Sequence, residues 1–270
     1  MPDHPCTSGL AAIVTGAADG IGWATAQHLA SDGYRVGLLD LRAEAATARA
    51  AELGPQHLGI ACDVTQAASV EAAVAEVAAK LGRIAVLVNN AGIGDQTGAT
   101  VDQNVDAFDR VLSVHLRGAF LMSQAVARRM LQAAPIDGLG RGAIVNLGSI
   151  ASTGGLPTRN AYSAGKAGIL GMTRAMASEW ARDGIRVNAV APGYVRTALL
   201  IELEEKGAID AAGIAHRTPM GRMAQPAEIA DAIAFLASPR ASYITGATLP
   251  VDGGWSAFGA TESQLAALGA

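Results

Sequence analysis

The fold class is decided by residues 10–22, which read LAAIVTGAADGIG. The apolar run 10–15 predicts a strand, and Ala26, Leu29 and Ala30 continue a helical pattern after the glycines. Glycine permits a tight turn between a strand and a helix. It also lets a pyrophosphate approach the backbone N–H groups at the helix N-terminus. Taken alone, such a turn could serve packing only.

Short apolar runs alternate with helical patterns along the rest of the chain. The further predicted strands are 34–39, 57–62, 84–89, 143–147, 186–191 and 248–251, and the predicted helices are 43–53, 67–81, 105–133 and 161–183. Apolar strands without polar alternation are typical of a parallel sheet buried on both faces. No linker-like stretch or internal repeat divides the chain. We therefore expect an α/β fold, with one Rossmann-type domain over residues 1–270, built on a doubly wound parallel sheet flanked by helices on both faces.

Two segments interrupt this alternation. Residues 134–141 are expected to form a surface loop. Residues 199–222 predict a charged helical excursion directly after a strand end, where open α/β sheets bind their ligands. We expect this second segment to act as a lid over the substrate.

Composition excludes several classes of function. The net charge is −4 and there is no block of Lys and Arg, which argues against a nucleic-acid partner. Residues 1–8 lack the basic start and apolar run of a secretory signal, and no apolar stretch approaches the roughly 20 residues that span a bilayer. We expect a cytoplasmic protein without membrane insertion. Cys6 and Cys62 are far apart and predict neither a disulfide nor a metal site.

Asp40 closes the second predicted strand, about twenty residues beyond the glycine turn. A carboxylate at this position can accept hydrogen bonds from the adenosine ribose hydroxyls. It would repel a 2′-phosphate, and Asp19 inside the glycine turn adds to that repulsion. Both residues favour NAD over NADP. Arg42 is the opposing observation, because an Arg just past this strand could bind a 2′-phosphate.

Tyr162 and Lys166 are four residues apart and therefore share one face of a predicted helix. Such a pair is usually a solvated helix face, but Ser149 precedes it at the end of a predicted strand. A base that accepts an alcohol proton at neutral pH needs a pKa far below the ordinary value of about 10 for tyrosine. Lowering that pKa by about three units takes roughly 4 kcal/mol, similar to one cation at about 4 Å with an effective dielectric of 20. Lys166 is a suitable cation.

The chain resembles the short-chain dehydrogenase/reductase family over about residues 9–255. Its glycine motif, Thr-Gly-x-x-x-Gly-x-Gly, is matched by Thr15, Gly16, Gly20 and Gly22. Further matches are Asp63-Val64, Asn89-Asn90-Ala91-Gly92, Ser149, Tyr162, Lys166 and Pro192-Gly193-Tyr194-Val195-Arg196-Thr197. Taken singly, Asp63 could cap the next helix and the Pro-Gly pair could form an ordinary turn.

The resemblance implies a role for each matched residue. Asp63-Val64 is expected at the adenine, the Lys at the nicotinamide ribose, Val195 and Thr197 at the carboxamide, and the Ser hydroxyl on the substrate oxygen. The expected catalytic residues are Ser149, Tyr162, Lys166 and His115. The expected cofactor contacts are Gly16, Asp19, Gly20, Ile21, Gly22, Asp40, Asp63, Val64, Asn90, Ala91, Gly92, Tyr162, Lys166, Pro192, Gly193, Val195 and Thr197.

His115 departs from the family, which usually has Asn at this position. In the family this Asn helps to place a water that links the Lys to solvent, partly through main-chain geometry at a local helix distortion. A His could take over the relay by donating or accepting through a ring nitrogen. It could equally be packed in the helix with only a backbone role. Both interpretations stay open.

These observations predict an enzyme that moves hydride between NAD and a secondary alcohol or its ketone, with a polyol, sugar or other small alcohol favoured. A 3-oxoacyl-thioester reductase is the first alternative, although such enzymes usually prefer NADPH. A non-catalytic dinucleotide-binding protein is the second.

Family members are commonly tetramers, so we expect a homotetramer joined through the helices 105–133 and 161–183 and the last strand. The tail 256–270 is a candidate contact with a neighbouring subunit.

Overall fold

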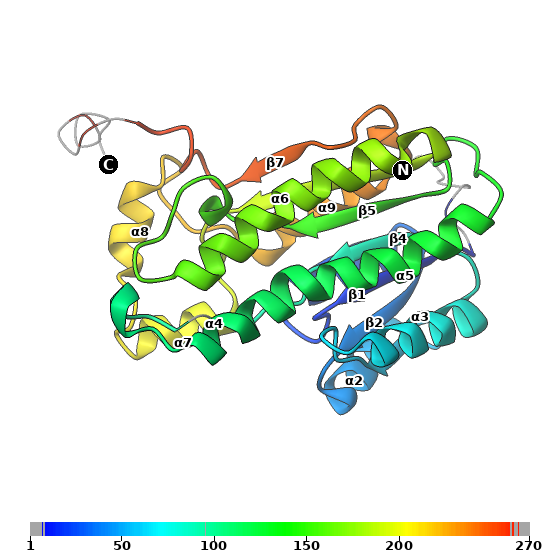
Figure 1. Cartoon of the computed structure of the whole chain (residues 1–270), viewed down its shortest axis with the longest axis horizontal. Coiled ribbons are helices and arrows are strands. Elements are labelled where there is room, and N and C mark those ends of the chain that lie inside the picture. The colour runs from blue at the N-terminus through cyan, green and yellow to red at the C-terminus, as the bar shows by residue number, and fades with distance from the viewer. Residues whose placement is uncertain (1–6, 8, 95, 260, 262–263, 265–270) are drawn as a thin grey trace.

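The protein is described by a computed structural model covering residues 7, 9–94, 96–259, 261 and 264. Over these residues, seven parallel strands form one sheet in the order β3-β2-β1-β4-β5-β6-β7 (Figure 1). The strands are β1 (Ala11–Thr15), β2 (Arg35–Asp40), β3 (Leu58–Ala61), β4 (Ile84–Asn89), β5 (Gly142–Leu147), β6 (Ile185–Pro192) and β7 (Thr248–Val251).

The strand order places the ligand edge of the sheet. From β1 the chain builds outward through β2 and β3, then returns to the other side of β1 with β4 and continues to β7. The switch point therefore lies between β1 and β4, and open α/β sheets bind ligands outside the carboxyl ends of their strands at such a point. Every residue of β1, β4, β5 and β6 is buried, which agrees with their continuous apolar sequences.

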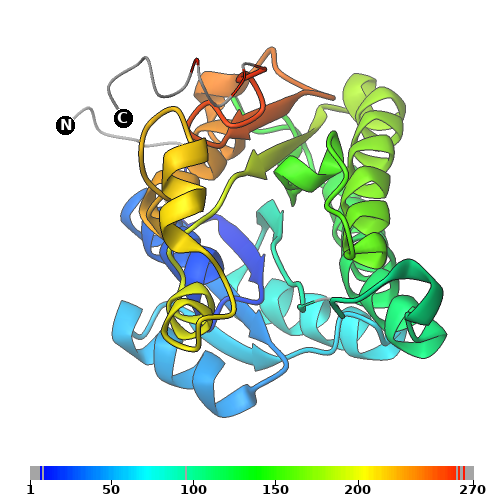
Figure 2. The same ribbon diagram turned by 90° about the vertical axis from the view of Figure 1, so that its left-hand side faces the viewer.

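Helices cover both faces of the sheet, as the sequence predicts. One face carries α1 (Gly20–Ser31), α2 (Ala43–Leu53) and α9 (Pro226–Ala237), and the other carries α3 (Ala67–Leu81), α4 (Val105–Leu112), α5 (Gly118–Gln132) and α6 (Asn160–Trp180). Two shorter helices, α7 (Ala198–Glu205) and α8 (Ala211–Arg217), stand at the edge toward which the arrowheads of β5 and β7 point (Figures 1 and 2).

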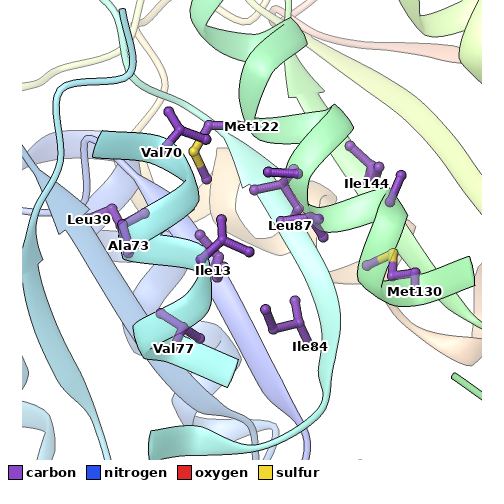
Figure 3. Close-up of a cluster of buried hydrophobic side chains, with 14 of the residues drawn as sticks. Ile13, Leu39, Val70, Ala73, Val77, Ile84, Leu87, Met122, Met130 and Ile144 are labelled. Atoms are coloured by element: carbon purple, nitrogen blue, oxygen red, sulfur yellow. The ribbon is translucent and has the colours of Figure 1, made fainter. Parts of the chain in front are cut away.

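Each helical layer has its own apolar core. Figure 3 shows the core beneath α3 and α5, where Val77 and Met122 pack over Ile13, Leu87 and Ile144 of the central strands. These five side chains are fully buried. Burying a side chain of this size contributes about 1.5 to 3 kcal/mol. The two cores fix the positions of the strands, and the turns at the strand ends are anchored to these strands.

The structure confirms the predicted fold class and most of the predicted elements, with three differences. The expected helix 105–133 is interrupted by a π-helical turn, Ser113–Arg117. The expected surface loop 134–141 buries Leu139 in the core beneath α9. Helix α9 was not predicted, although Pro226 stands at its start. Pro is in fact well suited to the first turn of a helix, and Gln225 and Glu228 complete a capping box around it.

Candidate active site

A cavity of about 680 Å³ opens at the carboxyl ends of the strands on both sides of the switch point. The predicted site residues come together there from eight separate segments of the chain. Those that line the cavity are Gly16, Asp19, Gly20, Ile21, Asp40, Asp63, Val64, Asn90, Ala91, Gly92, His115, Ser149, Tyr162, Lys166, Pro192, Gly193, Val195 and Thr197. Gly22 is the one predicted residue that does not line it.

The glycine turn is hydrogen-bonded to the turn that follows β4. Asn90 donates through Nδ2 to the carbonyls of Thr15 (2.9 Å) and Gly16 (3.0 Å), and its backbone N–H donates to Thr15 Oγ1 (3.0 Å). Gly16 has a φ of +62°, which favours glycine. A Cβ on Gly22 would lie 2.1 Å from the Gly16 carbonyl oxygen. Gly22 therefore lets α1 approach the turn closely, so its contribution to the site is packing.

Asp40 and Arg42 lie together at the edge of the cavity. Asp40 accepts the backbone N–H of Ala18 through Oδ2 (3.2 Å), which ties it to the glycine turn. Its Oδ1 accepts both the backbone N–H (3.0 Å) and the Nε (3.3 Å) of Arg42. The Asp40 side chain is 11% exposed and that of Arg42 is 63% exposed. The carboxylate is thus fixed by its neighbours, whereas the guanidinium projects into solvent from it.

Asp19 and Asp63 each accept a backbone N–H close to the residue, Asp19 at the start of α1 and Asp63 in the turn that precedes α3. Asp19 is the N-cap of α1 and accepts the Gly20 N–H at 2.7 Å. Asp63 accepts the Thr65 N–H (2.9 Å) and hydroxyl (2.7 Å) through the same oxygen, Oδ1. Both carboxylates line the cavity as well. A local hydrogen-bonding role and exposure to the cavity therefore coexist at these two positions, with helix capping at Asp19 alone of the two.

Ser149, Tyr162 and Lys166 come together on the far side of the switch point. Ser149 follows β5 and caps a short 3₁₀ turn, accepting the Ala151 N–H at 3.1 Å. Lys166 is one helical turn beyond Tyr162 on α6, and its Nζ lies 5.7 Å from the centre of the Tyr162 ring. The ammonium donates to the Leu147 carbonyl at 2.6 Å, and the side chain is buried.

Burial shifts the pKa values of Tyr162 and Lys166 in opposite directions. It raises the pKa of Tyr162, against the opposing effects of a hydrogen bond with Ser149 and of the positive charge of Arg159. It lowers the pKa of Lys166 to about 8. The expected depression of the Tyr162 pKa by Lys166 is therefore not found in the chain by itself. Desolvation of the phenol outweighs the hydrogen bond with Ser149 and the positive charge of Arg159.

His115 sits in the π-helical turn, at the position where the family resemblance implies a distorted helix. Its Nε2 lies 3.1 Å from the backbone N and 2.9 Å from the carbonyl oxygen of Ile93, and its ring meets that of Tyr162 edge-on at 5.4 Å. Burial lowers its pKa to about 3, with a smaller effect from the charge of Lys166. The imidazole is thus neutral at physiological pH and links the loop after β4 to Tyr162.

Several lining residues were missed by sequence reasoning. Arg159, at the N-terminus of α6, places its guanidinium carbon 5.6 Å from the centre of the Tyr162 ring. Leu199 and Leu200 of α7, which belong to the predicted segment 199–222, also line the cavity, and its action as a lid stays a prediction. No motif signals Arg159. Its position three residues before Tyr162, in the segment that leads into α6, is the only sequence cue.

Other predictions concern groups away from the cavity. Within the described ranges, no cluster of three or more His, Cys, Asp or Glu side chains could hold a metal ion. The described helices include none that is long and apolar enough to cross a membrane. Cys62 is buried, which raises the pKa of its thiol. Cys6 and most of the predicted contact region at the end of the tail lie outside the described residues.

Known proteins resemble this chain in sequence and in structure. The family model described as enoyl-(acyl carrier protein) reductase matches residues 16–256. The short-chain type dehydrogenase/reductase y4vI of Sinorhizobium fredii is 45% identical over 255 residues, which cover 94% of this chain and 45% of that protein. The chain thus spans less than half the length of y4vI. The D-threitol dehydrogenase of Mycolicibacterium smegmatis is 46% identical over 253 residues, which cover 92% of this chain and 93% of that enzyme.

The crystal structure of a 3-ketoacyl-(acyl-carrier-protein) reductase from Brucella melitensis complexed with NADH superposes with a TM-score of 0.84 at 34% identity, covering 92% of this chain and 99% of that one. Since the family model spans the glycine turn, Ser149, Tyr162 and Lys166, and the threitol dehydrogenase aligns over nearly its whole length, this chain belongs to the short-chain dehydrogenase/reductase family of oxidoreductases.

Proposed function

We propose that this protein transfers hydride between NAD and a secondary alcohol or its ketone, with Tyr162 as the acid/base. The observation that carries the proposal is the arrangement of one cavity, with the glycine turn and Asp40 on one side of the switch point and Ser149, Tyr162 and Lys166 on the other. A polyol, sugar or other small secondary alcohol is the favoured substrate. The 46% identity to a D-threitol dehydrogenase supports that class.

The shape of the dinucleotide end fits the cofactor. The turn combines Gly16 at φ +62° with Gly20 at φ +53°, and a Cβ on Gly16 would lie 3.0 Å from the Ala91 backbone, so side chains here would fill the space that a diphosphate needs. Gly16, Gly20 and Ile21 would hold the diphosphate, Asp63 and Val64 the adenine, and Asn90, Ala91, Gly92, Pro192, Gly193, Val195 and Thr197 the remainder of the molecule. When bound, the nicotinamide supplies the hydride acceptor or donor.

The preference for NAD is assigned to Asp40. Its carboxylate is fixed by Ala18 and Arg42, so it cannot easily turn away from a ribose at this edge of the cavity. A 2′-phosphate would meet a fixed like charge. Arg42 would have to leave Asp40 to bind that phosphate. Arg42 is the one residue that favours NADP, and its ion pair with Asp40 makes it less available to a 2′-phosphate.

The proton chemistry is assigned to side chains of this chain. Ser149 donates a hydrogen bond to the substrate oxygen, and Tyr162 accepts the alcohol proton at its phenolic oxygen or returns it during ketone reduction. Lys166 provides positive charge beside the phenolate. Because burial raises the pKa of Tyr162, the base form needs this charge and a further cation in the site. His115 is assigned a positioning role, holding the loop at Ile93 against Tyr162.

The test is the absorbance of reduced nicotinamide with NAD or NADP across polyols, cyclic alcohols, hydroxy acids and aryl alcohols. Turnover with NAD that Tyr162→Phe abolishes, while NAD affinity stays within about threefold, would support the proposal. Tyr243→Phe is the matched control, since Tyr243 is fully exposed and lies outside the cavity. A Tyr162→Phe protein that still turns over would refute the mechanism. A preference for NADP in the unaltered protein would refute the assignment to Asp40.

Two alternatives remain distinguishable. The likeness to the Brucella 3-ketoacyl reductase favours a reductase of 3-oxoacyl thioesters, which would oxidise NADPH with an acyl thioester and show little activity on polyols. A non-catalytic binding protein would bind NAD without turnover on any substrate.

We also propose a homotetramer, because Val105 and Phe120 expose apolar side chains on α4 and α5, where the family resemblance places subunit contacts. Light scattering that shows a stable monomer at micromolar concentration would contradict it.

A further inference from the structure

The charged residues lining the cavity are divided between its two ends. Asp19, Asp40 and Asp63 follow strands on one side of the switch point, at the proposed dinucleotide end, and Arg42, which also lines this end, is paired with Asp40. On the Tyr162 side, the charged side chains among the described lining residues are Arg159 and Lys166, both cationic. Lys166 donates its hydrogen bond to Leu147. Arg159 is therefore the cation that this end of the cavity leaves available to a ligand.

Arg159 is not satisfied by the described part of the chain. Its Nε is buried and has no hydrogen-bond partner, and no described carboxylate forms an ion pair with the guanidinium. Its nearest polarisable contact is the Tyr162 ring, 5.6 Å from the guanidinium carbon. A buried N–H without an acceptor costs free energy, so such a group generally has an external partner. The acceptor would lie next to the proposed acid/base.

The backbone that presents Arg159 is strained and held in place. Thr158 has a φ of +66°, which is rare for a β-branched residue. Its carbonyl accepts Gln103 Nε2 at 2.8 Å, and on the other side Asn160 donates to Thr100 Oγ1 at 2.8 Å. These bonds clamp the segment to the 3₁₀ turn Thr100–Asp102 and to Gln103. Strain maintained in this way is typical of a ligand-binding segment rather than of a free loop.

The rest of this end of the cavity suits a carbon chain. The lining residues include four apolar side chains, namely Ile150, Leu156 and, from α7, Leu199 and Leu200. With Ser149 and Tyr162 at one end of that space and a guanidinium beside it, the site matches a molecule with a carbinol carbon and, a few bonds away, an anionic group. A guanidinium presents a planar fork of donors that a carboxylate fits in a bidentate manner.

We propose that Arg159 binds a carboxylate of the substrate, so that among the small secondary alcohols of the proposed function the substrate is a short hydroxy acid, with its oxo acid as the ketone, rather than a neutral polyol or sugar. This inference rests on the proposed function, because it names the substrate of the same site. Arg159 is thereby a specificity-determining residue. The carboxylate pairs with the guanidinium, and it neutralises the net positive charge on the Tyr162 side.

A purely electrostatic role of Arg159 makes a different prediction. The positive charge of Arg159 lowers the pKa of Tyr162, so the residue could act on the base alone. In that case its removal would impair charged and neutral substrates equally and would shift the pH profile of both. Recognition of a carboxylate would instead change the ratio between a hydroxy acid and the corresponding neutral amide. The ratio therefore separates the two roles.

The first experiment measures binding, by calorimetry of short oxo acids and their matching oxo amides with the NADH-loaded protein and with the protein alone. The acid should bind the loaded protein at least about tenfold more tightly than the amide, as expected for a charge-assisted pair. This preference should disappear in Arg159→Met and survive in part in Arg159→Lys. It should persist in Arg174→Met, which removes an exposed cation of α6 outside the cavity. Phosphonate and sulfonate analogues test whether another oxyanion is preferred, which would overturn the carboxylate assignment.

The second experiment compares kcat/KM for the hydroxy acid and the hydroxy amide with NAD. The acid-to-amide ratio should fall by about 10- to 100-fold in Arg159→Met. Equal binding of acid and amide to the unaltered protein would overturn the inference, and so would an equal loss for both substrates in the variant. Charge-selective binding that depends on Arg159 without any turnover would support the inference and refute the proposed function. Turnover of neutral alcohols without charge selectivity would support the proposed function and refute the inference.

Discussion

The buried ammonium of Lys166 should make the stability of this protein depend on pH in a predictable direction. Burial lowers the pKa of Lys166 from the ordinary 10.5 to about 8. The unfolded chain therefore holds the proton more tightly than the folded chain does. Below pH 8 the buried charge lowers the free energy of unfolding by its full amount. As the pH rises from 8 to 10.5, this penalty is progressively removed.

The magnitude follows from the two pKa values. Replacing Lys166 by Met removes the titration, so the comparison of the two proteins isolates it from all other groups. Relative to Lys166→Met, the unaltered protein should gain about 2 to 3 kcal/mol in free energy of unfolding between pH 7 and pH 10. Loss of the hydrogen bond to the Leu147 carbonyl adds a difference that does not depend on pH. The slope, rather than the absolute value, carries the prediction.

The assay is urea unfolding followed by tryptophan fluorescence without dinucleotide, at several pH values from 6 to 10. Lys80→Met on α3 is the matched control, because Lys80 is exposed and pairs only with Glu76 on the surface. Its difference from the unaltered protein should stay nearly flat over this range. A flat difference for Lys166→Met as well would refute the view that Lys166 is held as a costly buried cation.

Three further predictions concern the turn, the cofactor edge and the helix distortion. Gly22→Ala should lower the free energy of unfolding by about 1 to 3 kcal/mol and weaken NAD binding in calorimetry, because the added Cβ would lie 2.1 Å from the Gly16 carbonyl oxygen. Gly171→Ala on α6, where a Cβ meets nothing within 4 Å, should be neutral or stabilising, and equal effects would contradict the packing argument. Asp40→Asn should lower the NAD-to-NADP ratio of kcat/KM at least about tenfold, and an unchanged ratio would exclude repulsion by Asp40. Because the pKa of His115 is about 3, kcat should show the same inflections between pH 5 and 8 in the unaltered protein and in His115→Gln, and an inflection lost in the variant would restore a proton-carrying role.

Sequence patterns were most successful where a single local signal determined the structure. The helices 43–53 and 67–81 and the strands 84–89 and 248–251 agree with the structure to the residue. In each case an apolar run or helical pattern is bounded by residues that end it. Patterns failed where one residue type supports opposite outcomes, as at Pro226, which can stop one helix or begin another.

The candidate site could be predicted as a set of residues but not as a geometry. Parallel strands end at the same edge of a sheet, so motifs that follow strands were expected to meet, and they do. The distance from Lys166 to Tyr162, the pairing of Arg42 with Asp40 and the orientation of Arg159 depend on rotamers and on contacts between distant segments. Gln103, for example, fixes Thr158 across 55 positions of sequence. Such contacts leave no trace in a local pattern.

The division of charge in the cavity explains how an acidic chain could take an anionic cofactor. The lining side chains at the proposed dinucleotide end include three carboxylates, so the charge of a diphosphate would have to be met mainly by backbone N–H groups at the start of α1. In the proposed binding mode those groups would meet a diphosphate, whereas an additional 2′-phosphate would lie beside the Asp40 carboxylate. Cationic side chains are instead placed around Tyr162, where they favour the phenolate and an anionic substrate. One cavity can thereby select against charge at the adenosine end and for it at the reacting end.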